Sequence, residues 1–244
     1  MKKRKILSLE YDAVTLSEAT KAVLSAAKEK RALRVFTPGA TVAAAAEKDR
    51  ELLSLLLRAD LLLADGVGVA LASRLAGEGK TETVRGIALG EEVLAEAGRA
   101  GLRVFFYGGR EGVAERAAEK WKARYPRLFF ATASGYGVDP TEEILAFSPD
   151  ILFVCLGVPR QEAYILKNAE SLCCPSLALG GSLDVWSGDV LRAPRIFQKM
   201  GLEWLWRTAL EPWRAKRLLP LPTYFYRCAS VGFKKLLRKR QKEG

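Results

Sequence analysis

The chain has 244 residues, of which 39 are basic and 28 acidic, giving a net charge of +11. This length accommodates one large α/β domain with a small appendage. No uncharged apolar run reaches the roughly 18–20 residues that a membrane-spanning helix needs. The basic start is followed by Glu10 and Asp12, which exclude the apolar core of a signal peptide. We therefore expect a cytoplasmic protein whose contact with a membrane is peripheral.

The chain contains no histidine, and its four cysteines show no Cys-x-x-Cys spacing. The absence of histidine excludes Ser–His and Cys–His nucleophilic mechanisms and histidine-containing zinc sites. We expect the cysteines to be reduced, structural thiols. Any general base in this protein must therefore be a carboxylate.

Apolar runs that predict strands alternate along the chain with segments that have helical spacing. The strands are predicted at residues 33–37, 61–64, 103–107, 128–132, 151–156 and 176–179. The helices are predicted at residues 47–57, 69–75, 90–100, 111–124 and 160–172. Buried parallel strands have continuous apolar sequences, so this alternation predicts an α/β fold, a Rossmann-like and mostly parallel sheet with flanking helices, over residues 1–195. Ligands bind such sheets beyond the carboxyl ends of the strands.

Residues 196–244 have a different pattern, which predicts a small helical appendage. Apolar residues at helical spacing predict an amphipathic helix over residues 202–213, a break at residues 219–222 and a second helix over residues 224–240. From Arg192 to the end there are fourteen basic residues against three acidic ones, so the rest of the chain is neutral. Three of the five tryptophans lie in this basic segment.

Basic residues beside aromatic ones suit an anionic membrane surface. They also suit a nucleic acid, but tryptophans at apolar helical positions favour membrane insertion, or packing on the body, over base stacking. The tryptophans could instead form the appendage's own core. We expect an anionic membrane and no nucleic acid as partner, with membrane contact through Trp204, Trp213, Lys234, Lys235, Arg238 and Lys239.

Asp65 is the candidate general base. It follows the apolar run 61–64 and precedes Gly66 and Gly68, so it is placed at a strand end to face a ligand. The alternative is a helix N-cap, a position that aspartate favours.

Two glycine-rich strand ends are candidates for binding a diphosphate through backbone N–H groups. One is Gly108-Gly109, after Tyr107; the other is Gly181-Ser182, with Asp184 close behind. A tight turn between strand and helix is the alternative for both.

A third strand end, Gly157, precedes Pro159 at a predicted helix start. Gln161 and Glu162 in the first turn of that helix could bind sugar hydroxyls or a base, or could only begin the helix. The chain has no Asp-x-Asp pair, the usual metal–diphosphate ligand of many sugar-nucleotide enzymes. Without it, charge on a leaving diphosphate would be met by arginines and backbone donors, and we expect no metal or other cofactor.

These motifs, in this order, resemble the TagA/WecG-type bacterial glycosyltransferases over nearly the whole chain. The resemblance is carried by Ala64-Asp65-Gly66-Val67-Gly68, Phe106-Tyr107-Gly108-Gly109, Ser134-Gly135-Tyr136, residues 149–157, Pro159-Arg160-Gln161-Glu162, Gly180-Gly181-Ser182-Leu183-Asp184, Arg192-Ala193-Pro194-Arg195 and residues 201–207. Their order and spacing together are specific.

The resemblance implies a metal-independent, inverting transfer from a UDP-sugar, typically UDP-N-acetylmannosamine, to an undecaprenyl-diphosphate-linked amino sugar at the inner face of the bacterial cell membrane. It implies that Asp65 is the base and that Thr37 lies in the pocket. The implied donor site comprises Gly108, Gly109, Tyr136, Gly157, Gln161, Glu162, Gly181, Ser182 and Asp184. It also implies that an arginine of the appendage closes the site, for which the candidates are Arg207, Arg214 and Arg217. A homo-oligomer is left open.

Two positions depart from the family pattern. Gly39 stands where the family usually has Asn, and Ala88 where it often has Asp. These departures leave open a binding protein without catalysis or with altered donor specificity, whose basic tail holds an anionic surface. An enzyme with a soluble acceptor is a third alternative.

Overall fold

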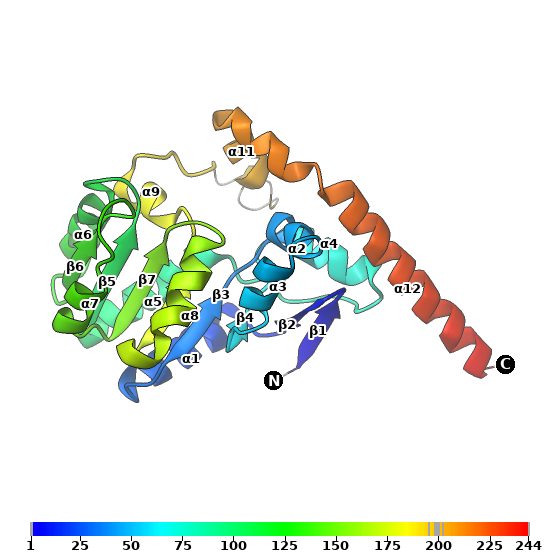
Figure 1. Ribbon diagram of the computed structural model, residues 1–244, viewed down its shortest axis with the longest axis horizontal. Helices are drawn as coiled ribbons and strands as arrows, with labels where there is room; N and C mark the ends of the chain where they lie inside the picture. The colour runs from blue at the N-terminus through cyan, green and yellow to red at the C-terminus, as the bar shows by residue number, and fades with distance from the viewer. Residues whose placement is uncertain (1, 195, 198–200, 202, 244) are drawn as a thin grey trace.

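The computed structural model describes residues 2–194, 196, 197, 201 and 203–243, of which Arg207, Trp213, Arg214, 239, 240, 242 and 243 are described by backbone alone. Its centre is a six-stranded parallel sheet of strand order β4-β3-β8-β7-β5-β6, with helices on both faces (Figure 1). The strands are β3 (Leu33–Phe36), β4 (Leu61–Leu62), β5 (Arg103–Gly108), β6 (Phe129–Ala133), β7 (Ile151–Cys155) and β8 (Pro175–Ala178). The Rossmann-like architecture and all six predicted strands are confirmed.

Each strand divides its side chains between two hydrophobic clusters, because successive residues of a strand point to opposite faces. In β5, Val104 and Phe106 join one cluster, whereas Phe105 and Tyr107 join the other. Helices α1 (Leu16–Lys28), α5 (Gly86–Ala100), α6 (Val113–Arg124) and α9 (Ser182–Ser187) contribute to the first cluster. Helices α2 (Ala40–Ala46), α3 (Arg50–Leu56), α4 (Val67–Leu75), α7 (Thr141–Phe147) and α8 (Arg160–Leu172) contribute to the second. Burial on both faces explains the continuous apolar sequences of the strands.

Several elements differ from the sequence expectation. An antiparallel hairpin, β1 (Lys3–Ile6) and β2 (Leu9–Asp12), and helices α1, α2 and α7 were not predicted. The helix expected over residues 47–57 begins only at Arg50, because Asp49 caps it by accepting from Glu51 N and Leu52 N, each at 3.0 Å.

The C-terminal segment forms α11 (Glu203–Leu210), a 3₁₀ helix η1 (Pro212–Leu218) and α12 (Leu221–Glu243). The single helix expected over residues 202–213 was therefore too long. It ends at Leu210 because proline at position 212 disfavours helical geometry just before it. Pro222 does not break α12, since it lies in the first turn, where proline is tolerated.

The first half of α12 is docked on the body, and its far end projects away from it (Figure 1). Tyr224 and Cys228 are buried in the second hydrophobic cluster. At Gly232 the helix passes so close to the end of α4 that a Cβ would lie 2.0 Å from Leu75 O, so only glycine fits there. Lys235 then donates from Nζ to Ala76 O at 3.1 Å and pairs with Glu78 at 2.5 Å.

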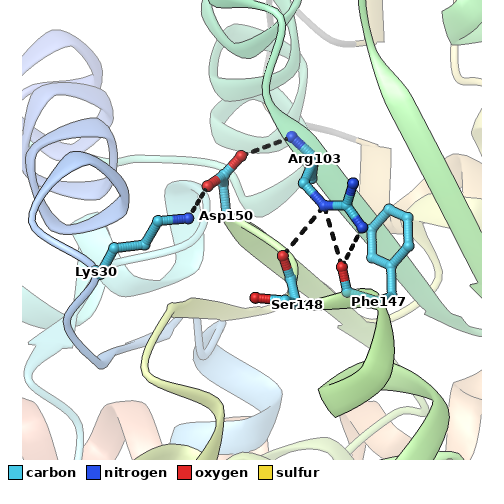
Figure 2. Close-up of polar contacts among 5 residues, drawn as sticks. All are labelled: Lys30, Arg103, Phe147, Ser148 and Asp150. Carbon is cyan, nitrogen blue, oxygen red and sulfur yellow. Dashed lines mark hydrogen bonds and ion pairs between the residues drawn. The ribbon is translucent and has the colours of Figure 1, made fainter.

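The amino end of the sheet is closed by a polar network (Figure 2). The Asp150 carboxylate accepts from Lys30 Nζ and, at 2.8 Å, from Arg103 N. The Arg103 guanidinium lies 4.3 Å from the centre of the Phe147 ring and donates to Phe147 O. This network fixes the starts of β5 and β7, at the opposite end of the strands from the site described next.

Candidate active site

A cavity of about 940 Å³ lies at the carboxyl ends of β3, β4 and β8, between the body and the C-terminal segment. Its floor includes Gly39, Asp65, Leu179, Gly181 and Ser182 from the strand ends. One wall is a face of α4 and the start of α5, and another comes from the appendage, with Glu203, Trp204, Leu218, Leu221 and Phe225. The cavity therefore lies where open α/β sheets bind ligands.

Asp65 lines this cavity and is half-buried. It pairs with Gly39 in a parallel bridge that continues the β3–β4 pairing past the ends of both strands. Helix α4 has Gly66 as its N-cap, with φ +82°, so the N-cap alternative for Asp65 is wrong. Asp65 therefore lies at the cavity, and its role as general base stays a prediction.

Thr37 lies beneath the cavity wall and does not form part of its lining. Its Oγ1 donates to Ala178 O at 3.2 Å, which joins the ends of β3 and β8. A Cβ at Gly86, which does line the cavity, would lie 2.7 Å from Thr37 Oγ1. Gly86 therefore lets the start of α5 pack directly over the threonine.

The other glycine-rich strand ends lie along the same edge of the sheet. Gly108 has φ +141°, and a Cβ there would lie 2.4 Å from Cys155 O of the paired strand β7, so only glycine fits there. Gly109 O accepts from Gly135 N at 2.8 Å, which joins this strand end to the loop carrying Tyr136, a residue 68% exposed. Gly108, Gly109, Tyr136 and Gly157 lie beyond the lining of the cavity, over β5, β6 and β7.

The Gly181-Ser182 strand end is part of the cavity, whereas Asp184 is not. Ser182 is buried, and its Oγ donates to Leu179 O at 2.8 Å. Asp184 is half-buried on α9. The cavity thus unites only part of the expected donor site, and the donor-binding roles stay predictions.

Gln161 and Glu162 form a buried clamp between two strand ends. Gln161 Oε1 accepts from Gly157 N at 3.2 Å and from Gly180 N at 2.9 Å. Its Nε2 donates to Glu162 Oε1 at 2.9 Å. Both side chains are nearly inaccessible, at 4% and 2% exposed. The amide is therefore occupied by the protein itself, and it joins the loop after β7 to the loop after β8.

Burial raises the pKa of Glu162 above its ordinary value near 4.5. The folded state then holds a proton that the unfolded chain has released, so Glu162 lowers stability as pH rises from about 4.5 through its folded pKa. We expect Glu162→Gln, which keeps an acceptor for Gln161 Nε2, to remove this loss. In thermal melts between pH 4 and 8, the melting temperature of the variant should rise relative to that of the wild type as pH rises. Glu162→Leu should be less stable than Glu162→Gln by about 1–3 kcal/mol at every pH, because Nε2 loses its partner.

If Glu162→Gln is more stable than the wild type by the same amount at every pH, this account of the carboxyl group is contradicted.

Three arginines of the body line the cavity in the part of the chain whose side chains the structure describes. Arg74 lies on α4, Arg85 is the N-cap of α5 and Arg192 follows α9. Arg192 pairs with Glu91 at 2.5 Å. Arg217 is exposed and outside the lining, while the side chains of Arg207 and Arg214 lie outside the described residues. No sequence motif marked Arg74 or Arg85, because only the fold brings them to the strand ends.

The appendage residues that we expected to contact a membrane differ from one another in their surroundings. Trp204 lines the cavity and is 46% exposed, which argues against a core position, whereas Trp206 packs on Phe197 with ring centres 5.5 Å apart. Lys234 and Arg238 are exposed, but Lys235 is held by Glu78. The side chains of Trp213 and Lys239 lie outside the described residues.

Among the described residues, no three or more His, Cys, Asp or Glu side chains gather as a metal site would require. No helix within the described part of the chain is both long and apolar enough to span a bilayer.

Residues 4–241 match the model of the Glycosyl transferase WecG/TagA/CpsF family. A protein of Bacillus subtilis (strain 168) named N-acetylglucosaminyldiphosphoundecaprenol N-acetyl-beta-D-mannosaminyltransferase is 37% identical over 196 residues, which cover 78% of this chain and 76% of that protein. A protein of the same name from Staphylococcus aureus (strain NCTC 8325 / PS 47) is 30% identical over 234 residues, covering 93% of this chain and 92% of its own length.

Proposed function

Because the chain belongs to the WecG/TagA/CpsF family of glycosyl transferases, we propose that it transfers N-acetylmannosamine from UDP to undecaprenyl-diphosphate-linked N-acetylglucosamine. Such a transfer serves the synthesis of teichoic acid or a related cell-surface polysaccharide. The observation that supports the proposal is the cavity at the strand ends, whose lining includes Asp65, Gly181 and Ser182.

Asp65 is the base of the proposed reaction. The acceptor hydroxyl loses its proton to the carboxylate as its oxygen attacks the sugar's anomeric carbon, and UDP leaves from the opposite side, so the configuration inverts. With no histidine in the chain, a carboxylate must do this work, and Asp65 is the aspartate on the floor of the cavity. Thr37 supports the floor by joining β3 to β8.

The donor lies over the glycine-rich ends of β5, β7 and β8 in this proposal. Gly108, Gly109 and Gly157 bring backbone close to the diphosphate, and the Gln161 clamp fixes Gly157 relative to Gly180. Arginines meet the charge on the departing UDP in place of a metal ion. Arg74, Arg85 and Arg192 supply positive charge in the cavity lining, and the appendage arginines remain candidates for closing it.

The acceptor's lipid requires a membrane surface. We place the protein at the inner face of the cell membrane, with residues 196–244 as a membrane-associating appendage to the body. The support is the position of α11 and α12: they form one wall of the cavity, and α12 also carries exposed apolar residues beyond its docked half.

Gly39 widens the cavity of this protein and influences the choice of donor. Its φ of −79° is open to any residue, and a Cβ would lie 3.4 Å from Asp65 O, an ordinary contact. Gly39→Asn therefore fits the fold and adds an amide to the lining. We expect this variant to change relative kcat/KM between UDP-sugars by about tenfold, the order of one hydrogen bond to a substrate group, with little change in melting temperature.

The same donor ranking in both proteins would show that position 39 does not contact the sugar.

A panel of UDP-sugars tests the proposed function. Each is supplied with an N-acetylglucosaminyl-diphosphate acceptor on a short isoprenyl chain, and release of UDP is measured with and without excess EDTA. We expect the highest kcat/KM for UDP-N-acetylmannosamine, unchanged by EDTA. Release of UDP that needs no acceptor, or activity that EDTA abolishes and Mg²⁺ or Mn²⁺ restores, would contradict the proposal.

A further inference from the structure

One ion pair joins the body to the start of α11 across the cavity. Arg85 Nη1 lies 2.6 Å from Glu203 Oε1, and both residues line the cavity. Their side chains are 37% and 25% exposed, so the pair is partly shielded from water. Arg85 precedes α5, which packs over the strand ends, whereas Glu203 is the first residue of α11.

Unlike Asp65, Glu203 has no role in the proposed transfer, and its carboxylate opposes the binding of diphosphates in the cavity. If the proposed function holds, both substrates carry a diphosphate, whose negative charge exceeds that of a single carboxylate. The Arg85 guanidinium is a fork of donors that suits phosphate oxygens. Glu203 Oε1 accepts a hydrogen bond from this guanidinium.

The start of α11 is held by a second contact close to this ion pair. Gly201, with φ +70°, packs so tightly on α4 that a Cβ would lie 2.1 Å from Val67 Cγ1. Val67 also lines the cavity, as does Trp204, which follows Glu203. Release of Glu203 would therefore free a contact that holds α11 over the cavity, while the contact at Gly201 remains.

We propose that Arg85 binds a substrate phosphate and that Glu203 is an intramolecular competitor for it, which the diphosphate displaces. Ligand binding is then coupled to the position of α11, since the helix keeps its contact at Gly201 while Glu203 is released. The inference rests on the proposed function for the identity of the ligand. The diphosphate belongs to the nucleotide or to the lipid acceptor, and the two share the chemistry that Arg85 recognises.

Calorimetric titration of the full-length protein with inorganic diphosphate tests this exchange. We expect Glu203→Gln to lower Kd about two- to fivefold, the range of partly exposed ion pairs, and Arg85→Ala to raise it about tenfold or more. In the Arg85→Ala background, Glu203→Gln should change nothing, because the competition needs both residues. Arg85→Gln, which is also neutral, takes the place of Arg85→Ala in this cycle if the alanine variant melts early. Titrations with UDP and with geranyl diphosphate then assign the site to the nucleotide or to the lipid.

Glu78→Gln is the matched control, because it removes another ion pair between body and appendage, with Lys235 at 2.5 Å, outside the cavity lining. It should leave Kd unchanged. The inference is overturned if Glu203→Gln leaves binding unchanged or weakens it, if Glu78→Gln gives the same gain, or if the gain survives in Arg85→Ala. Absence of sugar transfer alongside the expected binding changes would refute the proposed function alone.

Discussion

Replacing Asp65 by Asn is expected to lower turnover by about 10²–10⁴-fold, the usual contribution of a general base, while UDP still binds. The amide has nearly the carboxylate's shape but cannot take a proton at neutral pH. Because Asp65 pairs with Gly39 through the backbone, the substitution leaves the floor of the cavity intact. Loss of a negative charge from the lining should leave UDP affinity equal or slightly higher. Turnover and UDP titration on the same preparation measure both effects.

Asp60→Asn is the matched control, since Asp60 lies just before the same strand, at its other end. Its carboxylate pairs with Arg34 at 2.6 Å and accepts from Arg34 N at 2.8 Å, so its loss should lower stability and spare turnover. Near wild-type turnover in Asp65→Asn would remove Asp65 from the role of base.

Reversing the charges of Lys234 and Arg238 is expected to weaken binding to anionic vesicles at least about tenfold, because each basic residue near such a surface contributes about 1 kcal/mol. These two exposed residues lie on α12 beside the exposed Phe233, Leu236 and Leu237. Turnover on a short, soluble acceptor should be unchanged, since the cavity is formed by the earlier part of the appendage. Vesicle flotation at low and high salt measures the binding.

Lys28→Glu with Lys122→Glu changes the net charge equally on exposed surfaces of α1 and α6, and should leave flotation nearly unchanged. If both double variants lose vesicle binding equally, the overall charge of the protein, and not α12, holds it at the membrane surface. Deleting residues 196–244 is the poorer test, because Tyr224 and Cys228 are buried against the body and their removal uncovers its apolar surface.

The sheet could be predicted from the sequence because its strands are buried on both faces, apart from the partly exposed edge strand β6. The hairpin could not, since its exposed face interrupts the apolar pattern that marks the central strands. Helix α2 consists almost wholly of alanine, which gives no contrast between faces. Helix α1 did carry a signal, a capping box in which Thr15 and Glu18 bond reciprocally.

The cavity residues that lie at the ends of strands could be predicted from the sequence. Asp65, Gly181 and Ser182 are among them. Arg85 and Glu203 were beyond prediction, because their meeting depends on how the appendage folds back over α5. The engagement of Gln161 by two backbone N–H groups likewise requires the loops after β7 and β8 to be placed in space.

Analysis of the product tests the central claim most directly. The full-length protein is incubated with UDP-N-acetylmannosamine and an N-acetylglucosaminyl-diphosphate isoprenyl acceptor, and the lipid fraction is examined by mass spectrometry and NMR. The account predicts one added N-acetylhexosamine per acceptor, inverted at its anomeric carbon, with one UDP released. An acceptor that stays unmodified with every UDP-N-acetylhexosamine, or a product that retains the donor's anomeric configuration, would contradict it.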